Sequence, residues 1–216
     1  MWNEQIIMML LEGIKDTLYM TLTSTLIGYV IGLPMGILLT VTDKDGIHPN
    51  TAVYKVLDVI ANLIRSVPFL ILLIVLIPFT RFLIGRSYGP TATIVPLVIA
   101  AAPYIARMVE SSLKEVDAGV IEAARSMGAS NFTIVTKVML VEARTSLIVG
   151  ATISLGTILG YSAMAGTVGG GGLGDIAIRY GYTRWQTDIM IVTVILLVIL
   201  FQIFQTIGMK LSLIHI

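Results

Sequence analysis

The sequence predicts an all-α polytopic membrane protein with five transmembrane helices. Of its 216 residues, 56% are hydrophobic and 12% are charged, whereas a soluble domain carries about 25% charged residues. The mean hydropathy is +0.92, and apolar runs of about 20 residues, enough to cross a bilayer as a helix, recur along the chain. We expect one membrane domain over residues 1–216.

The charge balance and the rarer residue types exclude several kinds of site. A net charge of +1 implies no nucleic acid or other acidic polymer as a partner. The chain has no cysteine, which excludes disulfides and thiol chemistry. Two histidines, His48 and His215, are too few to build a metal site. No cofactor is expected.

The first residues read as an interfacial helix that leads into the first span. Residues 1–4 lack the basic start of a cleavable signal peptide. Apolar residues then recur at helical spacing from Ile6 to Leu18, with Glu12 and Lys15 between them. The first span is expected at about 18–41.

Glycines at a spacing of four residues predict close helix packing. Gly28, Gly32 and Gly36 form one smooth ridge on the first span, on which another helix can approach. Gly156 and Gly160 repeat the pattern in the fourth span, expected at about 146–165. Pro34 is expected to bend the first span.

The second and third spans are expected at about 57–84 and 92–109. Proline interrupts both, at Pro68 and Pro78 in the second and at Pro96 and Pro103 in the third. Such prolines suggest bent helices that surround a path through the membrane. The fifth span, about 188–209, has no such interruption.

A polar segment over about 113–144 separates the third and fourth spans and contains a short amphipathic helix. Asp117 can cap its start, and Gly128 suits a left-handed stop. Val120, Ile121, Ala124 and Met127 share one face at helical spacing. Because its surroundings are the most charged part of the chain, this helix should lie outside the bilayer and dock on another protein.

Basic residues flanking the spans predict the orientation. The richer side should be cytoplasmic, with the docking segment and the C-terminus inside and the N-terminus outside. That side would hold Lys44, Lys55, Arg65, Arg107, Lys114, Arg125, Lys137, Arg144 and Lys210. The other side would hold Lys15, Arg81, Arg86, Arg179 and Arg184.

Three function classes can be compared with the residues of the spans. A secondary transporter needs intramembrane acids, but Asp58 and Glu110 are expected near span ends. A membrane enzyme needs an activated nucleophile, and no histidine is expected beside the serines of the spans. A purely structural subunit stays open. The chain also has no phosphate-binding loop: its one G-x-G-x-x-G match, Gly169 to Gly174, follows no strand and is read as accidental.

The segment around the amphipathic helix resembles the EAA loop of bacterial ABC importer permeases. That pattern is EAA, three residues, Gly, nine residues, then Ile-x-Leu-Pro. Val138 and Leu140 occupy the hydrophobic positions, but Val141 replaces the proline, so the following helix is expected to run on unbroken. The family seats this helix in a groove of a separate cytoplasmic ATPase. The resemblance assigns that coupling role to Glu122, Ala123, Ala124, Arg125, Met127 and Gly128.

Further segments resemble the permease subunit of methionine ABC importers, over nearly the whole chain. They include Arg65-Ser66-Val67-Pro68-Phe69, Ala101 to Arg107, and Gly160 to Gly166 continuing through Gly174 to Tyr182. The apolar tail, residues 211–216, departs from the basic ending usual there. The resemblance implies a type I importer permease fold, a homodimer, two ATPase subunits, and a binding protein that delivers L- or D-methionine. A permease for another small amino acid or a peptide is the alternative.

Met164 is the candidate gate residue. It stands between Ala163 and Ala165 at the outer end of the fourth span, where small neighbours allow close helix approach. Two copies across a dimer axis would close the path with flexible apolar side chains. Tyr161 and Ser162 are included as pore candidates. A methionine that only fills a packing gap is the alternative.

Overall fold

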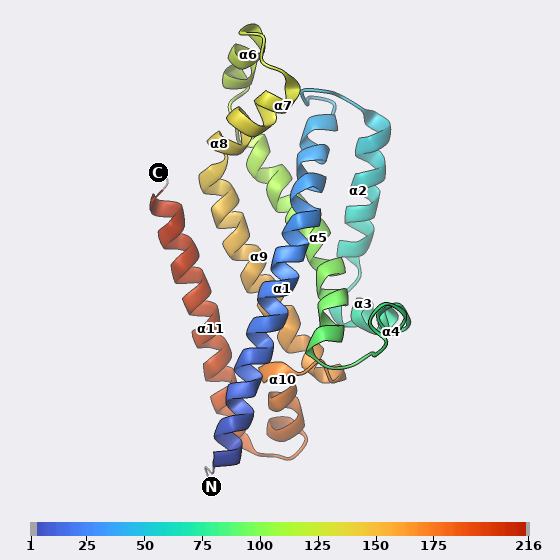
Figure 1. Cartoon of the computed structure of the whole chain (residues 1–216), viewed down its shortest axis with the longest axis vertical. Coiled ribbons are helices and arrows are strands. Elements are labelled where there is room, and N and C mark those ends of the chain that lie inside the picture. The colour runs from blue at the N-terminus through green and yellow to red at the C-terminus, as the bar shows by residue number, and fades with distance from the viewer. Residues whose placement is uncertain (1–3, 215–216) are drawn as a thin grey trace.

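The computed structural model describes residues 4–214 and is an elongated helical bundle (Figure 1). Four helices in this range are long and apolar enough to cross a membrane, or five if a bent pair counts as one span. The fold class predicted from the sequence is therefore confirmed. The predictions for residues 1–3 and for His215 lie outside the described range. The long helices are α1 (Glu4–Thr42), α2 (Thr51–Ser66), α5 (Pro90–Lys114), α9 (Arg144–Ala165) and α11 (Thr187–Ile214).

Helix α1 is longer than its predicted span. The segment expected as a separate interfacial helix is continuous with the span, so α1 has 39 residues and also runs through Pro34 without a break. Buried positions recur along it from Leu10 to Thr42. The neighbouring elements α10 and α5 cover it in succession, so the N-terminal part of α1 also packs against the rest of the protein.

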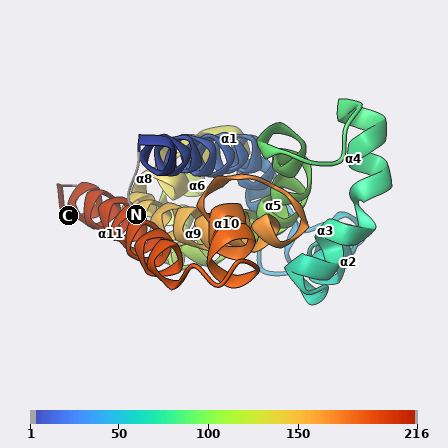
Figure 2. The same ribbon diagram turned by 90° about the horizontal axis from the view of Figure 1, so that it is seen from below.

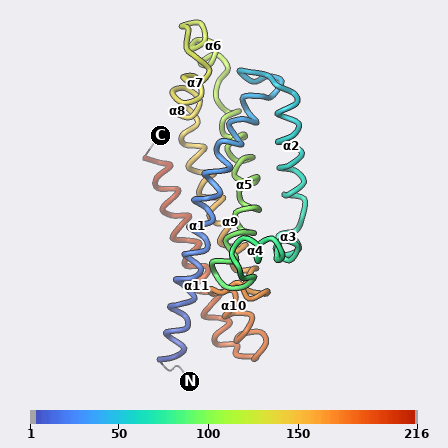
Figure 3. Tube along the Cα trace, turned by 45° about the vertical axis from the view of Figure 1, so that its right-hand side comes forward, coloured from blue at the N-terminus to red at the C-terminus, as the bar shows by residue number. Residues whose placement is uncertain are grey.

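The second predicted span, 57–84, is broken at Pro68, one of the two prolines expected to bend it, and so comprises more than one helix. α2 ends before Pro68, whose preceding residue Val67 is extended, as residues before proline generally are. The chain turns by 101° into α3 (Phe69–Val75), followed by α4 (Ile77–Ile84). Figure 2 shows α4 at the edge of the molecule, away from α11, and Figure 3 shows the chain passing from the lower end of α2 into α3 and α4. Pro78 lies in the first turn of α4, where proline is tolerated.

One basic residue departs from the predicted sidedness. Arg65 is expected on the same side as Lys44, but it is in the last turn of α2, the end of that helix that is remote from the polar segment 115–143 (Figure 1). The N-terminal end of α1 lies at the end of the bundle opposite that segment, and the C-terminal end of α11 lies toward it.

The contact between α1 and α5 is the most extensive in the bundle and depends on the glycine ridge of α1. A Cβ at Gly32 would stand 2.6 Å from the carbonyl oxygen of Ala102, and one at Gly36 would stand 2.5 Å from that of Ala106. The two backbones therefore touch. Ile105 and Val109 of α5 fill the spaces beside the ridge and are fully buried.

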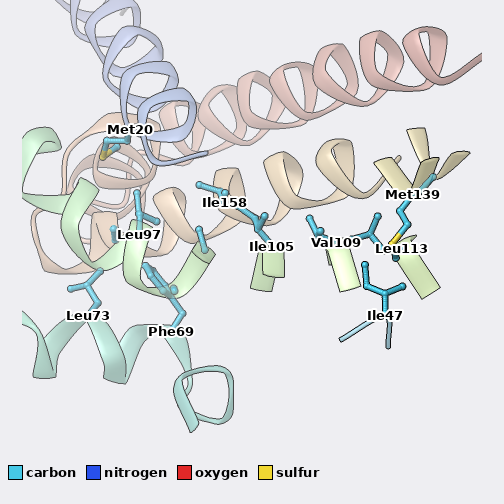
Figure 4. Close-up of a cluster of buried hydrophobic side chains, with 14 of the residues drawn as sticks. Met20, Ile47, Phe69, Leu73, Leu97, Ile105, Val109, Leu113, Met139 and Ile158 are labelled. Atoms are coloured by element: carbon cyan, nitrogen blue, oxygen red, sulfur yellow. The ribbon is translucent and has the colours of Figure 1, made fainter. Parts of the chain in front are cut away.

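The main core follows this contact. Figure 4 shows α5 side chains such as Leu97 and Ile105 between Met20 of α1, Ile158 of α9 and Phe69 of α3. A smaller cluster, which includes Leu173 and Ile189, joins the opposite end of α1 to α10 and α11.

The glycine-rich connection after α9 is a packing device. A Cβ at Gly166 would stand 2.2 Å from the amide nitrogen of Asp175, and one at Gly174 would stand 2.1 Å from the carbonyl oxygen of Ala163. The amide of Leu173 donates to Thr17 Oγ1 of α1 at 2.9 Å. The connection thus folds back on α9 and α1, which explains its glycines without any ligand. It comprises the 3-10 turn η2 (Gly166–Val168), α10 (Gly172–Ile176) and the π-helix η3 (Ala177–Tyr182).

Candidate docking helix and translocation path

The amphipathic helix of the polar segment is α6 (Ala118–Ser126), at one tip of the bundle (Figure 1). The side chain of Asp117 accepts a hydrogen bond from the amide of Gly119 at 2.7 Å and so caps the helix start. Gly128 ends the helix with φ of +82°, the left-handed conformation that favours glycine. The amide of Ala129 donates to the carbonyl of Ala124 at 3.1 Å and closes the final turn.

The six coupling candidates divide into an outward and an inward group. Glu122, Ala123, Met127 and Gly128 are exposed, and Met127 most of all at 82%. Ala124 is buried against the chain itself. Arg125 is exposed as well, but its guanidinium reaches back to donate a hydrogen bond of 2.6 Å to the carbonyl of Ile47, in the turn between α1 and α2.

Arg125 and Ala124 therefore hold α6 on the bundle and leave the other four positions available to a partner. The exposed apolar surface also includes Phe132, which is 78% exposed. Sequence reasoning missed it because it follows the helix, beyond the EAA pattern. Phe132 belongs to the short helix α7 (Asn131–Thr133).

The exit from the docking segment is less regular than the missing proline suggested. A π-helix, η1 (Ile134–Met139), and a short α8 (Leu140–Glu142) follow α7. A turn at Ala143 then separates α8 from α9. The expectation of an unbroken helix through Val141 is therefore wrong. The extra residue per turn of a π-helix redirects the chain into α9 without proline.

A chain of ion pairs joins the docking end of three helices. Arg107 of α5 pairs with Asp58 of α2, and it also pairs with Glu110 at 2.7 Å. Glu110 accepts from Lys114 at 2.8 Å, and Lys114 reaches Asp43 after α1 at 2.7 Å. The hydrogen bond from Lys114 holds the pKa of Asp43 below its ordinary value.

These pairs explain the two acids that sequence reasoning placed near span ends. Glu110 is buried, 5% exposed, and shares its carboxylate between Arg107 and Lys114, so both of its oxygens have a cationic partner. Arg107, Glu110 and Lys114 are spaced so that they share one face of α5, which can be predicted from the sequence. The pairing of Arg107 with Asp58, 49 residues away, cannot be predicted from local spacing.

The three pore candidates lie within one turn at the end of α9 but differ in exposure and partners. Met164 is 51% exposed at the end of α9. Tyr161 stacks on Phe69 of α3, with ring centroids 4.4 Å apart and planes within 6°. Ser162 is 1% exposed, and its hydroxyl lies 3.4 Å from that of Thr21 in α1. Within this chain Ser162 thus packs between α9 and α1, and its role in the pore stays a prediction.

The two glycines of α9 also differ. A Cβ at Gly156 would stand 2.6 Å from the ring of Phe201 in α11, so this glycine serves helix packing. At Gly160 a Cβ would meet nothing within 4 Å. Gly160, one residue before Tyr161, therefore lies on an open face of this chain, and its role in helix packing stays a prediction.

Residues 17–210 match the family model of the binding-protein-dependent transport system inner membrane component. A probable D-methionine transport system permease protein of Vibrio cholerae is 48% identical over 200 residues, covering 93% of this chain and 89% of that protein. The D-methionine transport system permease protein of Escherichia coli K12 is 50% identical over 164 residues, 76% of each chain. The chain belongs to this permease family.

Solved structures agree with the family assignment. An inward-facing structure of the MetNI methionine ABC transporter contains a chain that is 46% identical, with a TM-score of 0.98 and full coverage of both chains. A chain from an amino acid ABC transporter is 21% identical, covers 96% of this chain and 94% of its own length, and has a TM-score of 0.79, which shows the shared fold alone. As a permease of this family, the chain is a multi-pass component of the inner membrane and not the ATPase.

Proposed function

We propose that this permease carries methionine, in the L- and D-forms, into the cytoplasm in an ATP-driven importer. The observation that carries the proposal is the exposed docking helix α6, fixed to the bundle by Arg125 and presenting Met127 at 82% exposure. A partner must supply the nucleotide site because the chain has no phosphate-binding loop. The names of the relatives indicate methionine as the substrate; another small amino acid is the alternative.

The assembly we propose is a homodimer with two ATPase subunits and an external binding protein. Five spans enclose little more than their own packing, so a central path needs a second copy. The open face around Gly160 and Met164 is the surface that a two-fold partner would complete. With α6 on the ATPase, the C-terminus is cytoplasmic and the N-terminus is outside.

Uptake into proteoliposomes tests the proposal. Vesicles would contain the permease and its ATPase, with ATP inside and a methionine-loaded binding protein outside. We expect accumulation of radiolabelled L-methionine and D-methionine that requires ATP and stops when the ATPase is inactivated. Uptake of another amino acid in preference to methionine would contradict the substrate, and accumulation without ATP hydrolysis would contradict the mechanism.

Met164 is proposed as the gate of this path. Met164→Ala removes the flexible apolar side chain, so the closed state loses its seal, and we expect several-fold higher basal ATPase activity and leak with assembly unchanged. Met209→Ala is the matched control, because Met209 is 45% exposed but lies on α11. Unchanged leak and hydrolysis in Met164→Ala, or failure of Met164→Cys to form a disulfide across the dimer, would leave only a packing role.

A further inference from the structure

An apolar groove lies between α1 and α11, with α9 as its floor. The smaller core cluster joins α1 and α11 near the N-terminal end of α1, and the two helices diverge toward the docking end of the bundle (Figure 1). The groove between them has a volume of about 480 Å³, within the ~300–1,000 Å³ of ordinary ligand pockets. Its walls and floor include Leu22, Leu26, Ile148, Ala151, Ile207 and Leu211.

The polar groups of the lining are already engaged. The hydroxyls of Thr25 and Thr152 donate to carbonyl oxygens of their own helices, at 2.7 and 2.9 Å. The third polar residue of the lining, Tyr29, is hydrogen-bonded to Ser154 of α9. The other lining residues are apolar. A polar ligand would lose its hydration without finding partners here, so the lining suits a hydrocarbon chain.

The groove faces the bilayer and not the path. Ile148, Ala151 and Leu155 form the floor and recur at spacings of three and four residues, so they share one face of α9. Gly160 and Met164, on the open face assigned to the path, lie on roughly the opposite side of that helix. A second copy that completes the path therefore leaves the groove uncovered. The apolar surface of α11 beside it is also largely exposed.

Positive charges lie at one end of the groove. Arg144 precedes Ile148 by one helical turn, and Lys210 is the chain neighbour of Leu211. Both are exposed, and they are the only basic residues of α9 and α11. A lysine can lay its stem along apolar surface and keep its ammonium at the level of lipid headgroups. The groove thus combines an apolar channel with cations at the docking end.

We infer that the groove binds an acyl chain of an anionic phospholipid, from the leaflet at the docking end, with the phosphate beside Lys210 and Arg144. The chain gives the lining residues the dispersion contacts of a close-packed interior. It also supports the part of α11 that diverges from α1. The ligand class is a phospholipid, and the inference does not depend on which substrate the permease carries.

A photoreactive lipid tests the site in the complete importer. The bilayer would contain phosphatidylglycerol with a diazirine on one acyl chain, and adducts would be mapped on permease peptides after illumination. We expect several-fold more adducts on the groove residues than on Ile27 and Ile31. These two are 38% and 48% exposed, and they lie at a similar depth on the other side of α1, so they report ordinary contact with lipid.

Substitutions that fill the groove sharpen the test. Ala151→Trp places an indole on the floor, in the space of the acyl chain, and should lower groove adducts by about tenfold. Ile31→Trp is the matched control and should leave them unchanged. If Ala151→Trp does not assemble, Leu26→Trp fills the groove from its wall, at a residue that is 68% exposed and tolerant of a larger side chain.

The headgroup contact has its own test. Lys210→Gln removes one cation near the membrane surface and should lower groove adducts of the phosphatidylglycerol probe by about fivefold. A phosphatidylcholine probe with the same diazirine, which is zwitterionic, should respond less. Equal labelling by the two probes, unchanged in Lys210→Gln, would overturn the contact with an anionic headgroup.

Three results would overturn the site itself. The first is groove labelling no denser than that of Ile27 and Ile31. The second is groove labelling that persists in both tryptophan variants. The third uses the absence of cysteine from the chain: a disulfide between two copies of Leu26→Cys would show that a second permease, and not lipid, covers the groove.

Discussion

Gly128→Val is expected to lower ATP-driven uptake by about tenfold or more, equivalent to about 1.4 kcal/mol of lost coupling. Gly128 has φ of +82°, and a β-branched residue is strained in this conformation. The strain falls on the turn that ends α6, so the docking helix would tilt against its ATPase. Uptake and ATP hydrolysis, measured together in proteoliposomes, report whether the two remain coupled.

The open space around Gly128 means that Gly128→Val would act through backbone strain and not through a steric clash. A Cβ there would meet nothing within 4 Å, so the substitution causes no clash and the membrane bundle should keep its melting temperature. Gly128→Asn is the matched control, because asparagine tolerates the left-handed conformation better than other residues. Normal coupled uptake by Gly128→Val would show that the backbone at this turn does not govern coupling.

Gly32→Ala is expected to cause a large loss of stability through the contact between α1 and α5. The added Cβ would stand 2.6 Å from the carbonyl oxygen of Ala102 and 2.8 Å from Ile105, so α1 and α5 must separate. Overpacking of this kind costs about 1–3 kcal/mol, or roughly 2–12 °C in melting temperature for a chain of this size. Thermal unfolding of the purified permease in detergent measures it.

Gly28→Ala supplies the graded control. A Cβ at Gly28 would stand 3.0 Å from the terminal carbon of Ile105, a flexible group that can shift, and 3.2 Å from Ala101 Cβ. We therefore expect a smaller loss than at Gly32, and at Gly36 a loss similar to that at Gly32, since a carbonyl oxygen lies 2.5 Å away there. Equal stability of all three variants would contradict backbone contact between α1 and α5.

Local patterns were sufficient to predict the docking helix. The Asp117 cap, the apolar face and the Gly128 stop each depend on residues within one or two turns, and all three features are present in the structure. The all-helical membrane class followed from composition for the same reason. A segment that crosses a bilayer must satisfy its backbone hydrogen bonds internally, so its own apolar composition is enough to predict that it is a helix.

Features that depend on distant residues were predicted less well. The prolines signalled bends, but the 101° turn after α2 depends on how α3 packs on α5 and α9, which no local pattern gives. Burial of Ser162 against Thr21, and the open position of Gly160, likewise depend on which helix lies opposite. The ion pair between Arg107 and Asp58 joins residues 49 apart for the same reason.

Cross-linking from the docking helix tests the central claim that α6 seats in the ATPase. The chain lacks cysteine, so Met127→Cys carries a single photoreactive maleimide at an 82% exposed position. Tyr88→Cys, at a 70% exposed residue of the α4–α5 connection, is the control. Illumination of the assembled complex should join the permease to its ATPase from Met127→Cys and not from Tyr88→Cys. An ATPase adduct from Tyr88→Cys with none from Met127→Cys would contradict docking through α6.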